Sequence, residues 1–185
     1  MKRGRNKRGQ IWIETVIYTS IALLMIGVVL TYAKPKIEEF QDKIVLEQSL
    51  EMFRTIDKTI LEIKGIAGNT RFVEIGLKKG SLQIDGGADK IIFEMESHYI
   101  YSQPGTDIVD TVGGRIVTHT REIGDTANVN FTIDYAKEKI DITYNEKEEF
   151  KTLNKAPTPY KLLISNNGKD EEGNTKIDIS LSGLN

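Results

Sequence analysis

The sequence of 185 residues contains no cysteine and only two histidines. The absence of cysteine excludes disulfides, thiolate metal sites and cysteine nucleophiles. With no disulfide and only four prolines, any folded part must be held together by its core and its backbone pairing. Apolar residues make up 39% of the chain, which is enough for such a core and excludes disorder along the whole length.

The chain as a whole also lacks an excess of one charge. It has 25 basic and 27 acidic residues, and this net charge of -2 gives no basis for binding nucleic acid. Positive charge is instead concentrated at the start, where the first nine residues include five bases and no acid: Lys2, Arg3, Arg5, Lys7 and Arg8. The rest of the chain has 20 bases and 27 acids. The two ends are therefore expected to face different environments.

Motifs that carry enzyme chemistry are missing as well. The sequence has no G-x-S-x-G, H-E-x-x-H, P-loop or dinucleotide fingerprint. His98 and His119 lie in or beside predicted strands, where a polar strand face explains them better than a metal or an acid–base role. The acidic stretch 166–174 lacks the spacing of a calcium loop and is expected to be a solvated turn. We therefore expect a non-enzymatic protein with no catalytic residue, no metal ligand and no cofactor; an enzyme with an unrecognised site is the least favoured alternative.

A long apolar run is the first positive feature. Residues 11–33 read IWIETVIYTSIALLMIGVVLTYA, in which 17 of 23 residues are apolar and Glu14 is the only charged one. At about 1.5 Å per residue a helix of this length crosses the hydrocarbon of a bilayer. The preceding bases place its N-terminus in the cytoplasm and the rest of the chain outside. A cleaved secretory signal is the competing interpretation, but its apolar core is usually shorter and ends in a small-residue site that is not evident here.

Helical periodicity continues beyond Pro35. Apolar residues recur at steps of three and four, first at Ile37, Phe40 and Ile44, and then at Leu46, Leu50, Phe53, Ile56, Ile60 and Ile63. The step from Ile44 to Leu46 shifts the phase, which suits a helix that presents one face to one neighbour and a second face to another. Gly65 and Gly68 are expected to end this helix. If Pro35 only kinks it, the helical stretch runs from residue 11 to residue 64.

The remaining sequence is typical of β structure. Alternating or β-branched segments predict eight strands, at 71–77, 81–85, 90–96, 115–121, 128–135, 139–144, 160–165 and 175–181. Short, closely spaced strands with no helix between them favour an antiparallel sandwich or an open barrel. The predicted fold class is therefore α+β: a long N-terminal helix, first membrane-spanning (10–34) and then amphipathic (35–64), followed by an antiparallel β-rich head (65–185).

The junction before the apolar run carries the clearest functional signal. Lys7-Arg8-Gly9-Gln10 leads directly into the apolar helix, with Glu14 five residues after Gly9. A carboxylate in such a helix is costly in lipid, and an interfacial position or snorkelling is the alternative explanation for it. Taken together, the basic leader, the small residue, the Gln and the Glu resemble the class III signal of archaeal type IV pilins.

This resemblance implies a specific life history. Prepilin peptidase would remove residues 1–9 by cutting between Gly9 and Gln10, and Glu14 would be the carboxylate that acts in assembly together with Gln10. The precursor would sit in the cell membrane with its N-terminus in the cytoplasm and its head outside. A pilus assembly ATPase and a membrane platform protein would then add it to an extracellular, adhesive filament, a helical homopolymer of the same chain.

Two further possibilities are kept open. The chain is alternatively a single-pass membrane-anchored surface protein whose β-rich head binds a ligand or partner. Asn130-Phe131-Thr132 is the only N-glycosylation sequon, so Asn130 is a candidate acceptor if it faces outward on an exported head.

Overall fold

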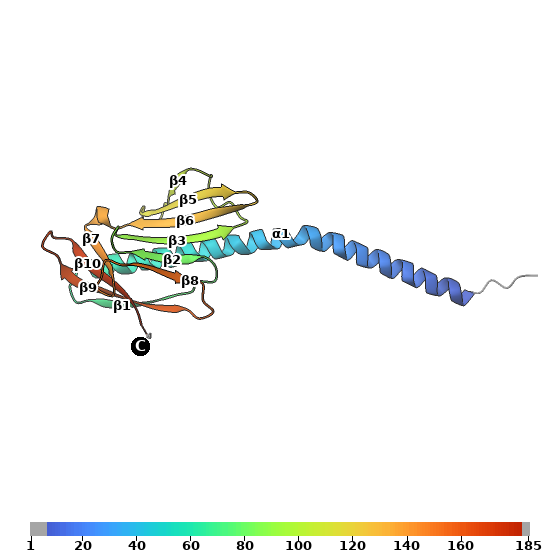
Figure 1. Cartoon of the computed structure of the whole chain (residues 1–185), viewed down its shortest axis with the longest axis horizontal. Coiled ribbons are helices and arrows are strands. Elements are labelled where there is room, and N and C mark those ends of the chain that lie inside the picture. Colours follow the sequence, from blue (N-terminus) through green and yellow to red (C-terminus); the bar gives the residue numbers. More distant parts are fainter. Residues whose placement is uncertain (1–6, 183–185) are drawn as a thin grey trace, which may run out of the picture. The chain divides into compact units, whose positions relative to one another are not determined.

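The structure is a computed structural model that describes residues 7–182, with side chains from Ile11 onward. It contains one long helix, α1 (Lys7–Lys64), followed by a β-rich head (Figure 1). The chain divides into two compact units with the boundary between Phe40 and Gln41. The predicted α+β class is confirmed, and so is the single long helix at the start of the chain.

The helix α1 continues through Pro35, which lies inside it. The shift in apolar phase falls close to the boundary between the two units. Leu46 and Phe53 are completely buried, whereas Ile37 and Phe40 are more than half exposed. The second apolar stripe therefore forms part of the core of the head, as the periodicity predicted.

The strands of the described residues form two separate sheets. The six-stranded sheet contains β2 (Ser81–Asp85), β3 (Lys90–Ser97), β4 (Asp107–Val109), β5 (Ile116–Ile123), β6 (Thr126–Asp134) and β8 (Phe150–Asn154), in the order β4-β5-β6-β3-β2-β8. The four-stranded sheet contains β1 (Thr70–Ile75), β7 (Ile140–Tyr144), β9 (Tyr160–Lys169) and β10 (Thr175–Leu181), in the order β1-β9-β10-β7. A 3-10 helix, η1 (Ala136–Glu138), joins β6 to β7.

Pairing is antiparallel in both sheets except between β7 and β10, which are parallel. Two separate sheets match the predicted sandwich and not the open barrel. All eight predicted strands are present. The prediction missed β4 and β8, and it placed a loop at 166–169 where β9 continues.

The core joins the helix to both sheets. Phe53 of α1 packs edge-on against Phe93 of β3 and Phe131 of β6, with ring centroids 6.4 and 6.3 Å apart. The same buried cluster includes Ile164 of β9 and Ile177 of β10 from the other sheet. Burial of this apolar cluster, to which the stripe of α1 contributes, is the main favourable contribution to the stability of the head.

Candidate functional site

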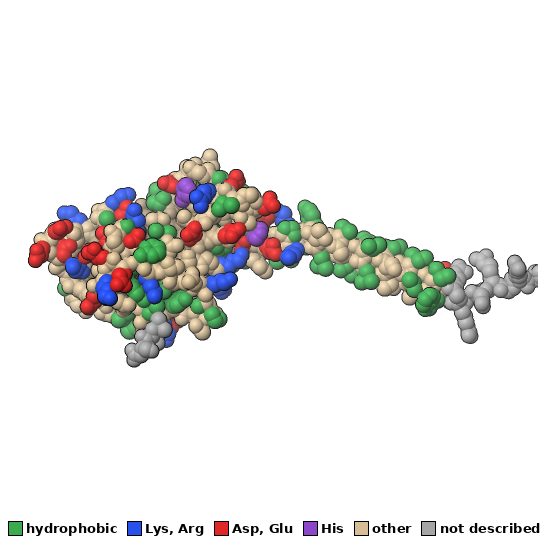
Figure 2. Space-filling model, viewed as in Figure 1, with side chains coloured by type: hydrophobic (Ala, Val, Ile, Leu, Met, Phe, Trp, Pro, Cys, Tyr) green, Lys and Arg blue, Asp and Glu red, His purple; other side chains and the backbone are tan. Residues whose placement is uncertain are grey.

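The N-terminal part of α1 is the strongest functional candidate, and it is apolar on all sides. Among the described residues, α1 is the one helix long and apolar enough to cross a membrane, and its most apolar stretch of 18 residues has a mean hydropathy of 2.1. Its large side chains are exposed; Trp12, Leu24 and Tyr32, for example, are each more than 70% accessible (Figure 2). A helix with apolar residues all around requires lipid or other protein surfaces around it.

Hydroxyl groups within this segment are satisfied by the helix itself. The side chains of Thr15, Thr19 and Ser20 donate hydrogen bonds of 2.8–2.9 Å to the backbone carbonyl four residues earlier. Thr31 donates in the same way to the carbonyl of Gly27, at 2.9 Å. Hydroxyls bonded in this way add little cost to burial in hydrocarbon. The segment can therefore anchor the chain in a membrane.

Glu14 lies on this helix, close to its described beginning, with an exposed side chain. It is the only charged residue between Ile11 and Ala33. The predicted cleavage site is less fully described: Gly9 and Gln10 lie in α1, but the Gln10 side chain lies outside the described residues, as does the whole of Met1–Asn6 in the predicted leader. The roles assigned to Gly9, Gln10 and Glu14 stay predictions.

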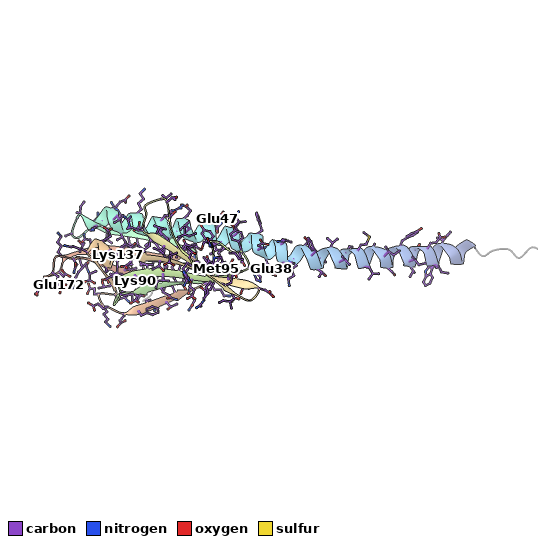
Figure 3. The ribbon with its side chains drawn as sticks, turned by 90° about the horizontal axis from the view of Figure 1, so that it is seen from above. Glu38, Glu47, Lys90, Met95, Lys137 and Glu172 are labelled. Carbon is purple, nitrogen blue, oxygen red and sulfur yellow. The ribbon has the colours of Figure 1, made fainter. Side chains whose placement is uncertain are left out.

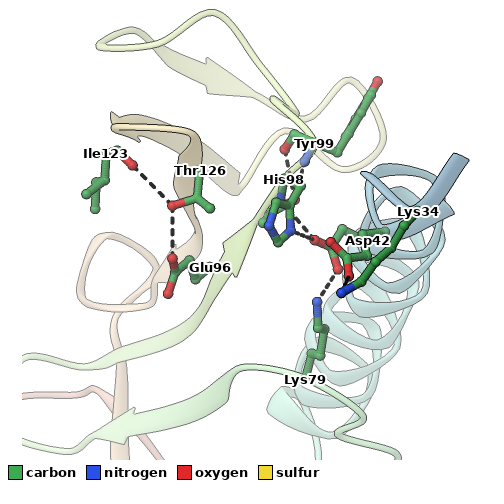
Figure 4. A network of polar contacts seen from close by, with 10 residues as sticks. Lys34, Asp42, Lys79, Glu96, His98, Tyr99, Ile123 and Thr126 are labelled. Carbon is green, nitrogen blue, oxygen red and sulfur yellow. Dashed lines mark hydrogen bonds and ion pairs between the residues drawn. The ribbon is translucent and has the colours of Figure 1, made fainter. Parts of the chain in front are cut away.

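Further along the chain, from Asp42 onward, polar contacts tie α1 to the head. Asp42 is completely buried and accepts hydrogen bonds from the backbone N–H of His98 (2.9 Å) and from the Lys79 ammonium; its Oδ2 also lies 3.1 Å from His98 Nδ1 (Figure 4). Gly80 (φ 75°) shapes the turn that presents Lys79, because a Cβ at this position would collide with the Glu94 carbonyl oxygen. Asp42 thereby links α1 to the ends of two strands.

The charge on Asp42 is stabilised in spite of its burial. Burial raises the pKa of a carboxyl group, but the hydrogen bonds from His98 and Lys79 outweigh this effect and lower the pKa of Asp42 below its usual value. Asp42 is therefore ionised at neutral pH and holds its partners as a charged acceptor.

Two bidentate Arg–Asp pairs fasten the middle of the helix. Arg54 of α1 donates from Nε and Nη2 to Asp110, both at 2.8 Å. Arg115, just before β5, donates to Asp57 of α1 at 3.1 and 2.5 Å. The Arg54 hydrogen bonds lower the pKa of Asp110 below its usual value. The two pairs thus hold the segment between β3 and β5 against α1. The helix supplies the arginine of one pair and the aspartate of the other.

Asp57 also accepts a hydrogen bond from a buried tyrosine. The Tyr135 hydroxyl donates to Asp57 Oδ1 at 3.3 Å, and the tyrosine is completely buried. Burial, and then the neighbouring Asp57 charge, raise the pKa of Tyr135 well above its usual value, so the phenol stays protonated and remains a donor.

The C-terminal end of α1 is capped from the four-stranded sheet. Asn166 of β9 donates from Nδ2 to the carbonyls of Ile63 (2.7 Å) and Lys64 (3.1 Å), which have no partner within the helix. The Lys64 ammonium donates to the Glu138 carbonyl in η1, at 2.6 Å. From Asp42 to Lys64, polar contacts therefore fix the helix to the head along its whole buried length.

Sequence reasoning did not single out this anchorage, although a signal for it was present. Asp42 is four residues before Leu46, and Asp57 is four residues after Phe53. Both acids thus occupy positions on the buried apolar stripe, and a buried charge requires partners.

Other sequence candidates are dispersed. His98 binds Asp42, while the Nδ1 of His119 lies 2.7 Å from Asp107 Oδ1 on the face of the six-stranded sheet. No group of three or more metal-ligating side chains occurs among the described residues. Asn130 lies in the middle of β6 between Glu94 and His119, with its Oδ1 buried and without a hydrogen-bond partner. Its glycosylation stays a prediction.

The acidic turn after β9 is organised by its own residues. Asp170 accepts hydrogen bonds from the Asn174 backbone N–H (2.7 Å) and Nδ2 (2.9 Å), and the Gly173 N–H donates to the Asp170 carbonyl (3.2 Å). These contacts hold a compact turn that leaves Glu171 and Glu172 exposed.

In comparisons with known proteins, no family model, curated protein or solved structure matches this chain.

Proposed function

We propose that this chain is a structural subunit, a pilin, of an archaeal type IV pilus-like surface filament. The observation that carries the proposal is the division of a single helix between two surroundings. Its first part presents apolar side chains on all sides, and its second part is fixed in the core and polar contacts of the head. The Lys-Arg-Gly-Gln junction and Glu14 add the resemblance to a class III signal.

The apolar part of this helix is suited to two successive environments, the membrane and the filament. In the precursor, lipid surrounds residues 11–33, and the basic leader holds the N-terminus in the cytoplasm. Removal of residues 1–9 takes away five positive charges and leaves a new α-amine on Gln10. Extraction from the membrane then becomes feasible, and neighbouring helices replace lipid around the same side chains.

Glu14 fixes the register of this assembly. Its carboxylate pairs with the Gln10 α-amine of a neighbouring subunit, a group that exists only after cleavage. A buried pair of this kind contributes little net stability, but an axial offset that separates the charges is penalised by several kcal/mol. The pairing therefore selects both the axial position and the processed form.

The anchorage in the head supports the same function. A filament subunit must transmit axial load from its helix to its head. Asp42, the two Arg–Asp pairs and Asn166 distribute that load over the buried length of α1.

Processing tests the proposal directly. Surface material is sheared from cells of the native host, inspected by negative-stain microscopy and measured by intact-mass spectrometry. We expect filaments whose subunit begins at Gln10 and contains 176 residues, from the 185 of the sequence. Replacing Gly9 by a bulky residue should block the cut, whereas Ala22→Gly, within the apolar run, should leave it unchanged. Surface material that retains Met1 and forms no filament would favour the single-pass anchored protein.

A further inference from the structure

Two small surfaces at opposite ends of the head carry charges of opposite sign, although each end also contains residues of the other sign, such as Glu96 at one end and Lys137 at the other. β3 runs from Lys90 to Ser97, Ser81 of β2 pairs with Glu94, and Asn154 of β8 pairs with Ser81. This register places the residues that flank those strand ends together. They are Lys78, Lys79, His98 and Lys155, and they lie at the end of the head that also contains Asp42.

The acidic turn after β9 lies at the opposite end. Asn166 of β9 caps the C-terminus of α1, and the turn at 170–173 follows three residues after Asn166. Figure 3 accordingly shows Glu172 at one end of the head and Met95, near the end of β3, toward the other. From Asp42 to Lys64 the helix rises about 33 Å at 1.5 Å per residue. The acidic turn and the cluster of Lys78, Lys79, His98 and Lys155 are therefore about this far apart within one copy.

Two hollows at the end of the head that contains Asp42 share Lys155. One, of about 420 Å³, is lined by Lys78, Lys155, Ala156 and Pro157 and by no acid. The other, of about 650 Å³, is lined by Lys79, His98 and Lys155 but also by Glu96, so it is of mixed charge. Asp42 neutralises Lys79, whereas Lys78 contacts only the neutral Gln48 amide, at 3.3 Å, and Lys155 has no ion pair within the described residues. The first hollow is therefore lined by two lysines and two apolar residues.

The acidic turn has the matching properties. Glu171 and Glu172 are exposed and form no ion pair among the residues that the structure describes, and the Asp170–Asn174 contacts hold the turn in one conformation. A preorganised turn with two carboxylates fits a hollow with two ammonium groups at little further entropic cost.

We propose that the acidic turn of one copy docks into the Lys78–Lys155 hollow of the next copy. The partner is a second copy of this chain, because the chain itself supplies both complementary surfaces. The contact is head-to-tail, so each copy has one surface still available after docking, and repetition gives an open filament. This contact deepens the proposed pilin function, on which it rests, by adding a head interface to the helix interface.

Cross-linking in the full chain provides the test, and the absence of native cysteine makes it clean. Lys155→Cys and Glu172→Cys are introduced together, and cells are treated with a mild oxidant before electrophoresis without reductant. Disulfide formation requires Cα atoms within about 7 Å, so the two sites cannot react within one copy. We expect a ladder of dimers, trimers and higher species from the double variant and, from either single variant, no species larger than a dimer.

A matched control introduces the second cysteine at a glutamate outside the acidic turn. Glu122 is an exposed glutamate at the end of β5, at the same end of the head as Lys155, and it forms no side-chain hydrogen bond or ion pair with any residue that the structure describes. The pair Lys155→Cys with Glu122→Cys should give no ladder. Filaments from the Lys155/Glu172 variant without a ladder would overturn the head contact while leaving the pilin function in place. A ladder without filaments would support the contact and count against the pilin function, and the absence of both would overturn both.

Charge exchange provides an independent readout. Reversing the hollow with Lys78→Glu and Lys155→Glu, or the turn with Glu171→Lys and Glu172→Lys, should reduce the yield of filaments about tenfold because like charges then meet. Combining the four substitutions should restore the yield. Failure of the combination to exceed either parent variant would overturn the proposed pairing.

Discussion

Asp42 and Asp57 are surrounded on α1 by apolar neighbours one turn away, yet both are charged acceptors. Taking a carboxylate out of water costs several kcal/mol, which only well-placed donors offset. Asp42 has His98 and Lys79, and Asp57 has Arg115 and Tyr135. At the residue scale, these two side chains give an otherwise apolar helix face specific contacts, so that it fits the head in a single position.

Removing the Asp57 carboxylate should therefore be costly. Asp57→Ala leaves Arg115 half-buried without its acceptor and the buried Tyr135 hydroxyl without a partner. We expect a loss of about 2–3 kcal/mol in the free energy of unfolding. Denaturant unfolding of the full chain in detergent, followed by near-ultraviolet circular dichroism, measures this loss.

The control for Asp57 is on the same helix. Glu62 forms an exposed pair with Lys58, at 3.8 Å, so Glu62→Ala should change stability by less than about 0.5 kcal/mol. Replacing both members of the buried pair, with Asp57→Leu and Arg115→Met, should cost less than Asp57→Ala alone, because no charge is then stranded. Equal losses for Asp57→Ala and Glu62→Ala would contradict the role of the buried pair.

Asp42 gives the head a defined acid sensitivity. Its pKa is lowered in the folded state, so its contribution to stability is present above its unfolded pKa, near 3.8, and is lost as pH falls through the lower folded value. Asp110 acts in the same direction. We expect the melting temperature to fall below about pH 4, and to fall less steeply in Asp42→Asn. Asp107→Asn, on an exposed pair, should keep the wild-type slope.

At the scale of elements, α1 contacts the aromatic residues of the six-stranded sheet. Phe53 is completely buried and packs edge-on against both Phe93 and Phe131, which stack on each other. Phe53→Ala should destabilise the head by about 3–5 kcal/mol through lost burial and the cavity left behind. Phe72→Ala on β1, where the ring is 68% exposed, is the matched control and should cost less than about 1 kcal/mol. Thermal unfolding of both variants in detergent compares them.

Periodicity predicted the elements well where one pattern ran long enough. The steps of three and four from Leu46 to Ile63 identified the buried face of α1, and alternation identified eight strands. β8 was missed because Phe150 and Leu153 are three residues apart and follow a charged run, and β4 was missed because three residues carry too little pattern. The parallel pairing of β7 with β10 depends on the tertiary path of the chain, which no local pattern reports.

The polar anchorage was harder to predict for a related reason. Arg54 meets Asp110 and Asp57 meets Arg115 across more than fifty residues of sequence. The position of an acid on the apolar stripe of the helix predicts that it is buried. Which distant basic residue it pairs with depends on the tertiary structure. The apolar segment and Glu14 required no such information, because length and composition alone distinguish them.

At the scale of the whole molecule, the proposed function requires one chain to be stable in lipid, in water and in contact with its own copies. The head is stable in water through a core that includes the second half of α1, whereas the first half exposes apolar side chains and satisfies its hydroxyls internally. Such a division fits a subunit that is stored in a membrane and later transferred to a filament. In the proposed function, the step of transfer depends on the groups that Glu14 meets in the membrane and in the filament.

Glu14 should consequently act in assembly and not in insertion or cleavage. Glu14→Ala removes the carboxylate that is costly in lipid, so membrane insertion and the cut after Gly9 should proceed as in the wild type. Filaments should nevertheless be lost, because neighbouring helices no longer have a charge that fixes their register against the Gln10 amine. Glu14→Gln should retain part of the assembly if hydrogen bonding contributes more than charge, and Thr15→Val, at the next position, serves as the control. Cell fractionation, intact mass and counts of filaments per cell separate the three steps, and wild-type filament counts from Glu14→Ala would return Glu14 to a purely interfacial role.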